Sequence, residues 1–121
     1  MNDAQQMQEK MRSLGERYLR RTYTELDQLE ATLAQFRAGA VSALKEVERM
    51  MHKIRGSGAM FGFNELSDCA GQGELLCATN QDDPSVAAKL ENCLRDLRVH
   101  LRAAADSRNI ALEHGSASPT G

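Results

Sequence analysis

The sequence predicts an all-α fold, an up-and-down antiparallel four-helix bundle with a short N-terminal lead helix. Apolar residues recur at alternating spacings of three and four along most of the chain, as in helices with one buried face. Short breaks containing Gly, Asn or Pro separate these segments. Only 4% of the residues are aromatic and none is tryptophan, so leucine, alanine and methionine must fill the core. Four amphipathic helices with short connections pack most economically as a bundle.

The first helical segment is expected over residues 3–36, with a break near Ser13 and Gly15 that separates the lead helix from a long one. Its apolar stripe consists of Met7, Met11, Leu14, Tyr18, Thr22, Leu26, Leu29, Leu33 and Phe36. Gly39 marks the end of the segment, because glycine readily adopts the left-handed conformation that closes many helices. The second helix is expected from about residue 40 to residue 61.

The third helix is expected after a break at residues 62–64, with Asn64 as its N-cap. Gly71 and Gly73 lie inside it and weaken it, either to let two helices approach closely or because the helix is loose. The fourth helix is expected to begin with Asp83 as N-cap and Pro84 as first helical residue. These helices form one predicted domain over residues 1–108, and residues 109–121, which lack apolar periodicity, are expected to be a flexible tail.

Charge and hydropathy exclude several classes of function. The net charge of −2 gives no electrostatic reason to expect nucleic acid or an anionic membrane as partner. No apolar run approaches the length of a membrane-spanning helix, and the N-terminus lacks a secretion signal, so we expect a cytoplasmic protein. We interpret Cys69, Cys77 and Cys93 as reduced core residues and expect no metal site. Four helices that cover one another's apolar stripes favour a monomer.

The sequence M-M-H-K-I-R-G-S-G-A-M-F-G-F at residues 50–63 contains the feature that indicates function. It follows a helical apolar stripe, yet Gly56 and Gly58 each weaken a helix interior by about 1 kcal/mol relative to alanine. Gly56 lies one turn after His52 on the same face, and Ala59 lies about one turn further. This arrangement predicts a docking surface around an imidazole, whereas Gly58 is better explained by close helix packing.

The segment His52-Lys53-Ile54-Arg55-Gly56-Ser57, followed by Gly62, resembles the signature of histidine-containing phosphotransfer (HPt) domains and of the related phosphorylatable domain of chemotaxis histidine kinases. The resemblance extends loosely over residues 14–105. It implies that His52 accepts a phosphoryl group from a kinase or a receiver-domain aspartate and passes it to a receiver domain. It also implies that Arg55, where the family usually has lysine, and Lys53 neutralise the phosphoryl oxygens.

The resemblance therefore implies a phosphocarrier in a two-component (His-Asp) phosphorelay, with Gly56 and Ala59 on the receiver docking surface. The implied partners are a response-regulator receiver domain and a sensor histidine kinase. No cofactor is expected, because the magnesium ion of such transfers belongs to the receiver. No nucleotide-binding sequence accompanies the bundle, so we expect no kinase activity of its own.

Hairpin geometry predicts that Glu74 orients His52. In an antiparallel hairpin that turns near Phe63, His52 lies eleven residues before the turn and Glu74 eleven after it. Both therefore stand about 16 Å from the turn, at 1.5 Å per residue, and should face each other. The carboxylate then accepts a hydrogen bond from one ring nitrogen and leaves the other nitrogen's lone pair toward solvent. The family resemblance also implies glutamate or glutamine at this spacing.

Simpler interpretations stay open for each of these residues. A histidine at a helix border is often only a polar surface residue, Arg55 and Lys53 fit solvated charges, and Glu74 fits an ion pair with a neighbouring base. His100 and His114 receive no role, because neither has glycines or an acidic partner in register. Two other functions also remain: a helical adaptor that binds a receiver or kinase without accepting phosphate, and a phosphorylatable fragment of a chemotaxis-type kinase, which residues 59–63 resemble.

Overall fold

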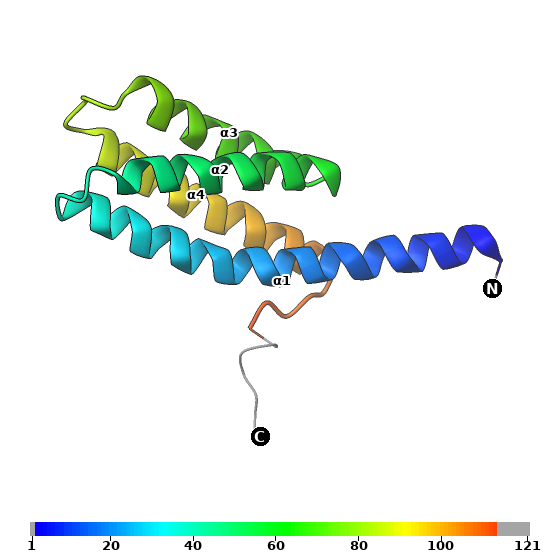
Figure 1. Cartoon of the computed structure of the whole chain (residues 1–121). Coiled ribbons are helices and arrows are strands. Elements are labelled where there is room, and N and C mark those ends of the chain that lie inside the picture. The colour runs from blue at the N-terminus through cyan, green and yellow to red at the C-terminus, as the bar shows by residue number, and fades with distance from the viewer. Residues whose placement is uncertain (1, 114–121) are drawn as a thin grey trace.

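The computed structural model describes residues 2–113 and shows an all-α bundle, with no strand in that range. The four helices are α1 (Asp3–Arg37), α2 (Ala43–Met60), α3 (Asn64–Thr79) and α4 (Val86–Ser107). Consecutive helices run in opposite directions (Figure 1), and α1 packs on α2, α2 on α3, α3 on α4 and α4 on α1. The predicted up-and-down antiparallel four-helix bundle is therefore confirmed.

The prediction of a separate lead helix is wrong, because α1 is one continuous helix of 35 residues. Gly15 does not break it: this glycine is buried, and a Cβ there would make an ordinary 3.8 Å contact with the Phe63 ring. One glycine costs a helix about 1 kcal/mol, which is less than ending it and nucleating another. The expected lead helix is instead the N-terminal part of α1, which projects beyond the bundle (Figure 1).

Leucine dominates the core, and Met51 and small alanines such as Ala70 and Ala105 pack among the leucines. The largest fully buried side chains include Leu19, Leu26, Leu29, Met51, Leu66, Leu90, Leu97 and Leu101. The three cysteines are free thiols; Cys77 and Cys93 are buried, and Cys69 is only partly buried. Burial raises the pKa of the Cys77 thiol to about 12, so this thiol stays protonated as a core residue does.

Helix ends follow the predicted glycines but not the predicted caps. Gly39 and Gly62 have φ angles of 110° and 82°, and these left-handed conformations turn the chain after α1 and after α2. The N-cap of α3 is Phe63 rather than Asn64, which is the first helical residue. The connection between α3 and α4 also differs from the prediction.

Asp83 is not the N-cap of α4, and Pro84 is not its first helical residue. Ser85 is the N-cap and the helix begins at Val86. The Asp83 side chain instead closes the preceding turn, where its Oδ1 accepts hydrogen bonds from the Ser85 backbone N–H and hydroxyl, each at 2.8 Å. The Lys89 ammonium donates to Oδ2, and these bonds lower the pKa of Asp83 well below its usual range. A turn of this kind delays the helix by two residues.

The predicted tail begins too early. After α4 the chain turns at Asn109, whose φ is 56°, and folds back so that Ile110 and Leu112 are buried against the bundle. Glu113 then pairs with Arg102 at 2.6 Å. Residues 114–121, the rest of the expected tail, lie outside the described residues.

None of the four helices combines the length and the apolar character that crossing a membrane requires, as judged over residues 2–113.

Candidate functional site

The α2–α3 hairpin brings His52 and Glu74 together, at the register that the sequence predicts. His52 Nδ1 lies 2.7 Å from Glu74 Oε2, and the two side chains are 64% and 23% exposed. Close packing near the turn sets this register: a Cβ on Gly58 would lie 3.4 Å from both the backbone nitrogen and the Cβ of Ser67. Gly58 is therefore a packing glycine, as expected. The imidazole stands at the edge of the core with its carboxylate partner partly shielded from water.

The contact with Glu74 selects one tautomer of His52. An ionised carboxylate only accepts hydrogen bonds, so Nδ1 must carry the proton and donate it. In the neutral ring, Nε2 then holds the free lone pair on the opposite side. Because the His52 side chain is mostly exposed, this nitrogen is available as a nucleophile to a reactant arriving from solvent.

Arg55 completes the cluster by binding the second oxygen of the same carboxylate. Its Nε lies 2.8 Å from Glu74 Oε1, and its Nη2 lies 3.3 Å from His52 Nδ1. Since Nδ1–H already donates to Glu74, the longer approach joins two N–H groups and is not a hydrogen bond. Glu74 thus pairs with a neighbouring base and contacts the histidine at once, combining two interpretations that the sequence left as alternatives.

Gly56 and Ala59 are exposed on the same helix as His52. A Cβ on Gly56 would meet no atom within 4 Å, so nothing inside the bundle requires glycine there. Met60, next to Ala59, is 74% exposed. The helix surface that follows His52 is therefore partly apolar, and at Gly56 no side chain projects from it.

Comparison with protein-family models now identifies the family. A model described as Hpt domain matches residues 13–107. The chain belongs to the Hpt family. Comparison with curated proteins finds no match, and comparison with solved structures finds none either. The match covers α2, α3, α4 and most of α1, whereas the N-terminal residues of α1 lie outside it. An Hpt domain is a phosphotransfer domain of two-component signalling, and it acts as a phosphocarrier rather than a kinase.

Lys53 of the Hpt domain does not join the cluster. Its ammonium lies 3.0 Å from Glu25 Oε2 on α1, and the Glu25 side chain is only 20% exposed. Lys53 therefore connects α2 to α1 rather than α2 to α3. This pair was missed in the sequence, because it depends on how α1 is placed against α2 and no local spacing records that placement.

A second contact that the sequence did not reveal joins α1 to the helix of His52. The Tyr18 hydroxyl lies 2.9 Å from Ser57 Oγ, and the Ser57 hydroxyl donates to the Lys53 carbonyl at 2.7 Å. The Tyr18 ring also stacks on Phe61, with centroids 4.9 Å apart, and on Phe63. The serine of the signature thus serves to fix α2 against α1 in this Hpt domain.

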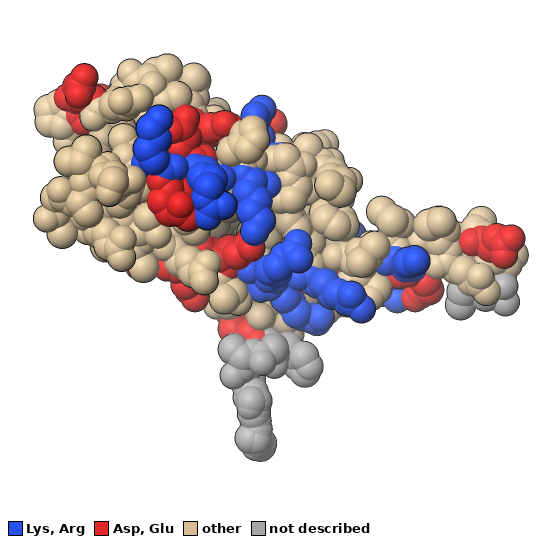
Figure 2. All heavy atoms as spheres, in the orientation of Figure 1, with Lys and Arg blue, Asp and Glu red and all other residues tan. Residues whose placement is uncertain are grey.

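The cluster lies on an open surface of mixed charge. On the face shown in Figure 2, Lys and Arg side chains gather over α2 and over the middle of α1, with Asp and Glu side chains between them. No group of three or more His, Cys, Asp or Glu side chains suited to a metal ion occurs within residues 2–113.

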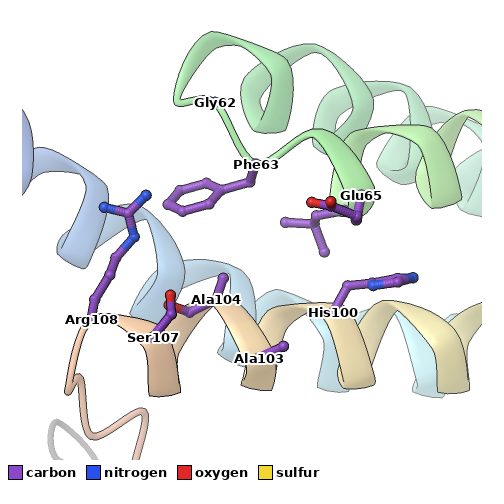
Figure 3. A pocket seen from close by; sticks show the side chains of 9 residues that line it. Gly62, Phe63, Glu65, His100, Ala103, Ala104, Ser107 and Arg108 are labelled. Carbon is purple, nitrogen blue, oxygen red and sulfur yellow. The ribbon is translucent and has the colours of Figure 1, made fainter.

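A groove of about 440 Å³ lies elsewhere, between the start of α3 and the end of α4 (Figure 3). His100 and Arg108 line it, and the Arg108 guanidinium sits 4.7 Å from the centroid of the Phe63 ring. None of the His52 cluster lines this groove. His114 lies outside the described residues. The His52 cluster is thus an open surface on α2 and α3, separate from this groove.

Proposed function

We propose that this Hpt domain carries phosphate on His52 in a two-component (His-Asp) phosphorelay. His52 accepts a phosphoryl group from a sensor histidine kinase or from the aspartyl phosphate of a receiver domain, and passes it to a receiver domain of a response regulator. The observation that carries this proposal is the 2.7 Å contact between Nδ1 and Glu74 on a mostly exposed imidazole. It leaves a single nitrogen, Nε2, as nucleophile.

In the proposed step the lone pair of Nε2 attacks the phosphorus of an aspartyl phosphate. A nitrogen–phosphorus bond forms as the bond between phosphorus and the aspartate oxygen breaks, and the bonding pair leaves with the aspartate as a carboxylate. No proton moves, because Nδ1 keeps its proton and the leaving carboxylate needs none. Glu74 therefore acts by orienting the ring and by stabilising the positive charge that the phosphorylated ring gains. It is not a general base.

Arg55 and Lys53 are the proposed stabilisers of the phosphoryl oxygens. Arg55 is half exposed and already beside the ring, so its remaining N–H donors need only a small side-chain motion to meet the transferred group. Lys53 must first break its ion pair with Glu25 before it can reach the phosphoryl group, so we expect it to contribute less than Arg55 does. Gly56 and Ala59 form the proposed docking surface, where the open space over Gly56 admits the partner. The divalent cation that the transfer requires would be bound by carboxylates of the receiver domain.

Incubation with phosphorylated receiver domains, and separately with the small phosphodonor phosphoramidate, tests this function. We expect acid-labile, alkali-stable label on the wild-type protein and none on His52→Gln, with His100→Gln labelled normally as the matched control. A receiver that binds without transferring label, together with no labelling by phosphoramidate, would instead support a phosphate-independent helical adaptor.

A further inference from the structure

Gly71 lies inside α3 next to the site, where helix propensity disfavours it. A Cβ added there would lie 3.0 Å from Arg55 Cδ and 3.7 Å from Arg55 Cγ, and would meet no other atom within 4 Å. Gly73 differs, because its Cβ would enter the core at 2.7 Å from Met51 Sδ. The missing side chain of Gly71 therefore makes room for one group, the aliphatic stem of Arg55.

The Arg55 side chain runs from the space over Gly71 to Glu74, the carboxylate that contacts His52. The Arg55 carbonyl accepts a hydrogen bond from Ser67 Oγ at 2.7 Å, which fixes the origin of the side chain against α3. The stem then crosses Gly71, and the guanidinium reaches Glu74 at 2.8 Å. Gly71 and Glu74 are three residues apart, so they are neighbours on one face of α3. Both line a shallow hollow of about 370 Å³ together with Arg55.

We propose that Gly71 is a positioning residue for phosphoryl transfer, an inference that rests on the proposed function of His52. Because Gly71 lacks a side chain, the Arg55 stem lies against α3 and its guanidinium holds Glu74 Oε1. Glu74 Oε2 then faces His52 Nδ1 and keeps the proton on that nitrogen. A larger residue at position 71 lifts Arg55 away from α3, releases one oxygen of Glu74 and lets the ring exchange tautomers.

Gly71→Ala and Gly71→Leu test this inference with phosphoramidate as the phosphodonor, which needs no docking surface. We expect the rate of His52 labelling to fall by about twofold and about fivefold respectively, because the Glu74 carboxylate remains and only its orientation is disturbed. The free energy of unfolding should not fall, because both residues favour helix more than glycine does. Gln72→Ala, on the exposed neighbouring position, is the matched control and should label normally.

Two further measurements separate positioning from a general structural effect. The ¹⁵N chemical shifts of the His52 ring should move toward tautomer-averaged values in the Gly71 variants and not in Gln72→Ala. In an Arg55→Ala background, Gly71→Leu should change neither the labelling rate nor the ring shifts any further.

Normal labelling and unchanged ring shifts in both Gly71 variants would overturn the inference. An undiminished effect of Gly71→Leu in the Arg55→Ala background would overturn it as well. Wild-type protein that takes no label contradicts the proposed function itself, and ring shifts that still follow Gly71→Leu would then support the positioning contact on its own.

Discussion

Replacing Glu74 by alanine should slow phosphoryl transfer to His52 without abolishing it. The substitution removes the acceptor 2.7 Å from Nδ1, so the ring is free to rotate and to carry its proton on either nitrogen. In the transition state the ring gains positive charge, so its hydrogen bond to Glu74 joins two charged groups and is worth roughly 1.5–3 kcal/mol, more than the exposed contact contributes in the free domain. At 1.36 kcal/mol per factor of ten this range corresponds to about 10- to 160-fold in rate. Because His52 is mostly exposed, we expect a loss near the lower end, about tenfold.

Glu74→Gln is the matched variant, because an amide oxygen still accepts a hydrogen bond from Nδ1–H while the negative charge is lost. Its rate should stay within about threefold of wild type. Both variants should change the free energy of unfolding by at most about 1 kcal/mol, since the ion pairs of Glu74 involve exposed partners.

The assay is the initial rate of His52 labelling by phosphoramidate, with urea denaturation as the check on folding. An unchanged rate in Glu74→Ala would refute the orienting role. A loss of about 10⁴-fold would instead indicate general-base catalysis, and equal losses in Glu74→Ala and Glu74→Gln would show that charge rather than orientation matters.

Three further predictions concern docking, packing and pH. Gly56→Leu should block phosphate transfer from a receiver domain yet leave labelling by phosphoramidate intact; equal effects on both donors would contradict a docking role. Gly56→Ala should raise the free energy of unfolding by about 0.5–1 kcal/mol, whereas Gly73→Ala should lower it by about 1–2 kcal/mol. The reason is that only the alanine at position 73 forces a Cβ against Met51 and Cys93. Urea denaturation measures both values, and a shift in the same direction for both variants would contradict this packing argument. The Arg102 guanidinium, with help from Tyr23, lowers the pKa of Glu113 from 4.5 to about 2, so the pairing stabilises the folded C-terminal segment above pH 4.5 and is lost as the pH falls from about 4.5 toward 2. The protection factor of the Leu112 amide, which corrects for the intrinsic pH dependence of exchange, should fall over that window in wild type and stay constant in Glu113→Gln. Identical profiles in the two proteins would refute the linkage.

The sequence predicted the contact between His52 and Glu74 because both positions follow from one symmetrical hairpin. Helical rise is constant, and the glycine turn at residues 62–63 fixes the centre from which both positions are counted. The same regularity predicted four helices and their antiparallel order. Features of this kind depend only on regular backbone geometry, so the spacing of residues along the sequence is enough to predict them.

The contacts that individual side chains make are less predictable from the sequence. The family resemblance implies that Arg55 and Lys53 both neutralise phosphoryl oxygens, but it does not indicate that Arg55 contacts Glu74 and Lys53 contacts Glu25. The first outcome depends on the space over Gly71, which only the packed α2–α3 pair creates. The second depends on the position of α1, which is set by the whole core. Neither relation leaves a local pattern in the chain.

At two places long-range packing overrides the local sequence signal. The local sequence predicts a helix break at Gly15, but a single glycine packed near Phe63 costs the helix little. The sequence also predicts a flexible tail that includes Ile110 and Leu112, because two apolar residues are too few to form a periodic pattern. Their burial depends on the turn at Asn109 and on the pairing of Glu113 with Arg102.

The most direct test of the central claim is to locate the phosphoryl group on the phosphorylated protein by ³¹P–¹⁵N correlation NMR. We expect phosphorus bonded to Nε2 of His52, with Nδ1 still protonated and its proton shifted downfield by the hydrogen bond to Glu74. Phosphorus on Nδ1, or on any residue other than His52, would contradict the account.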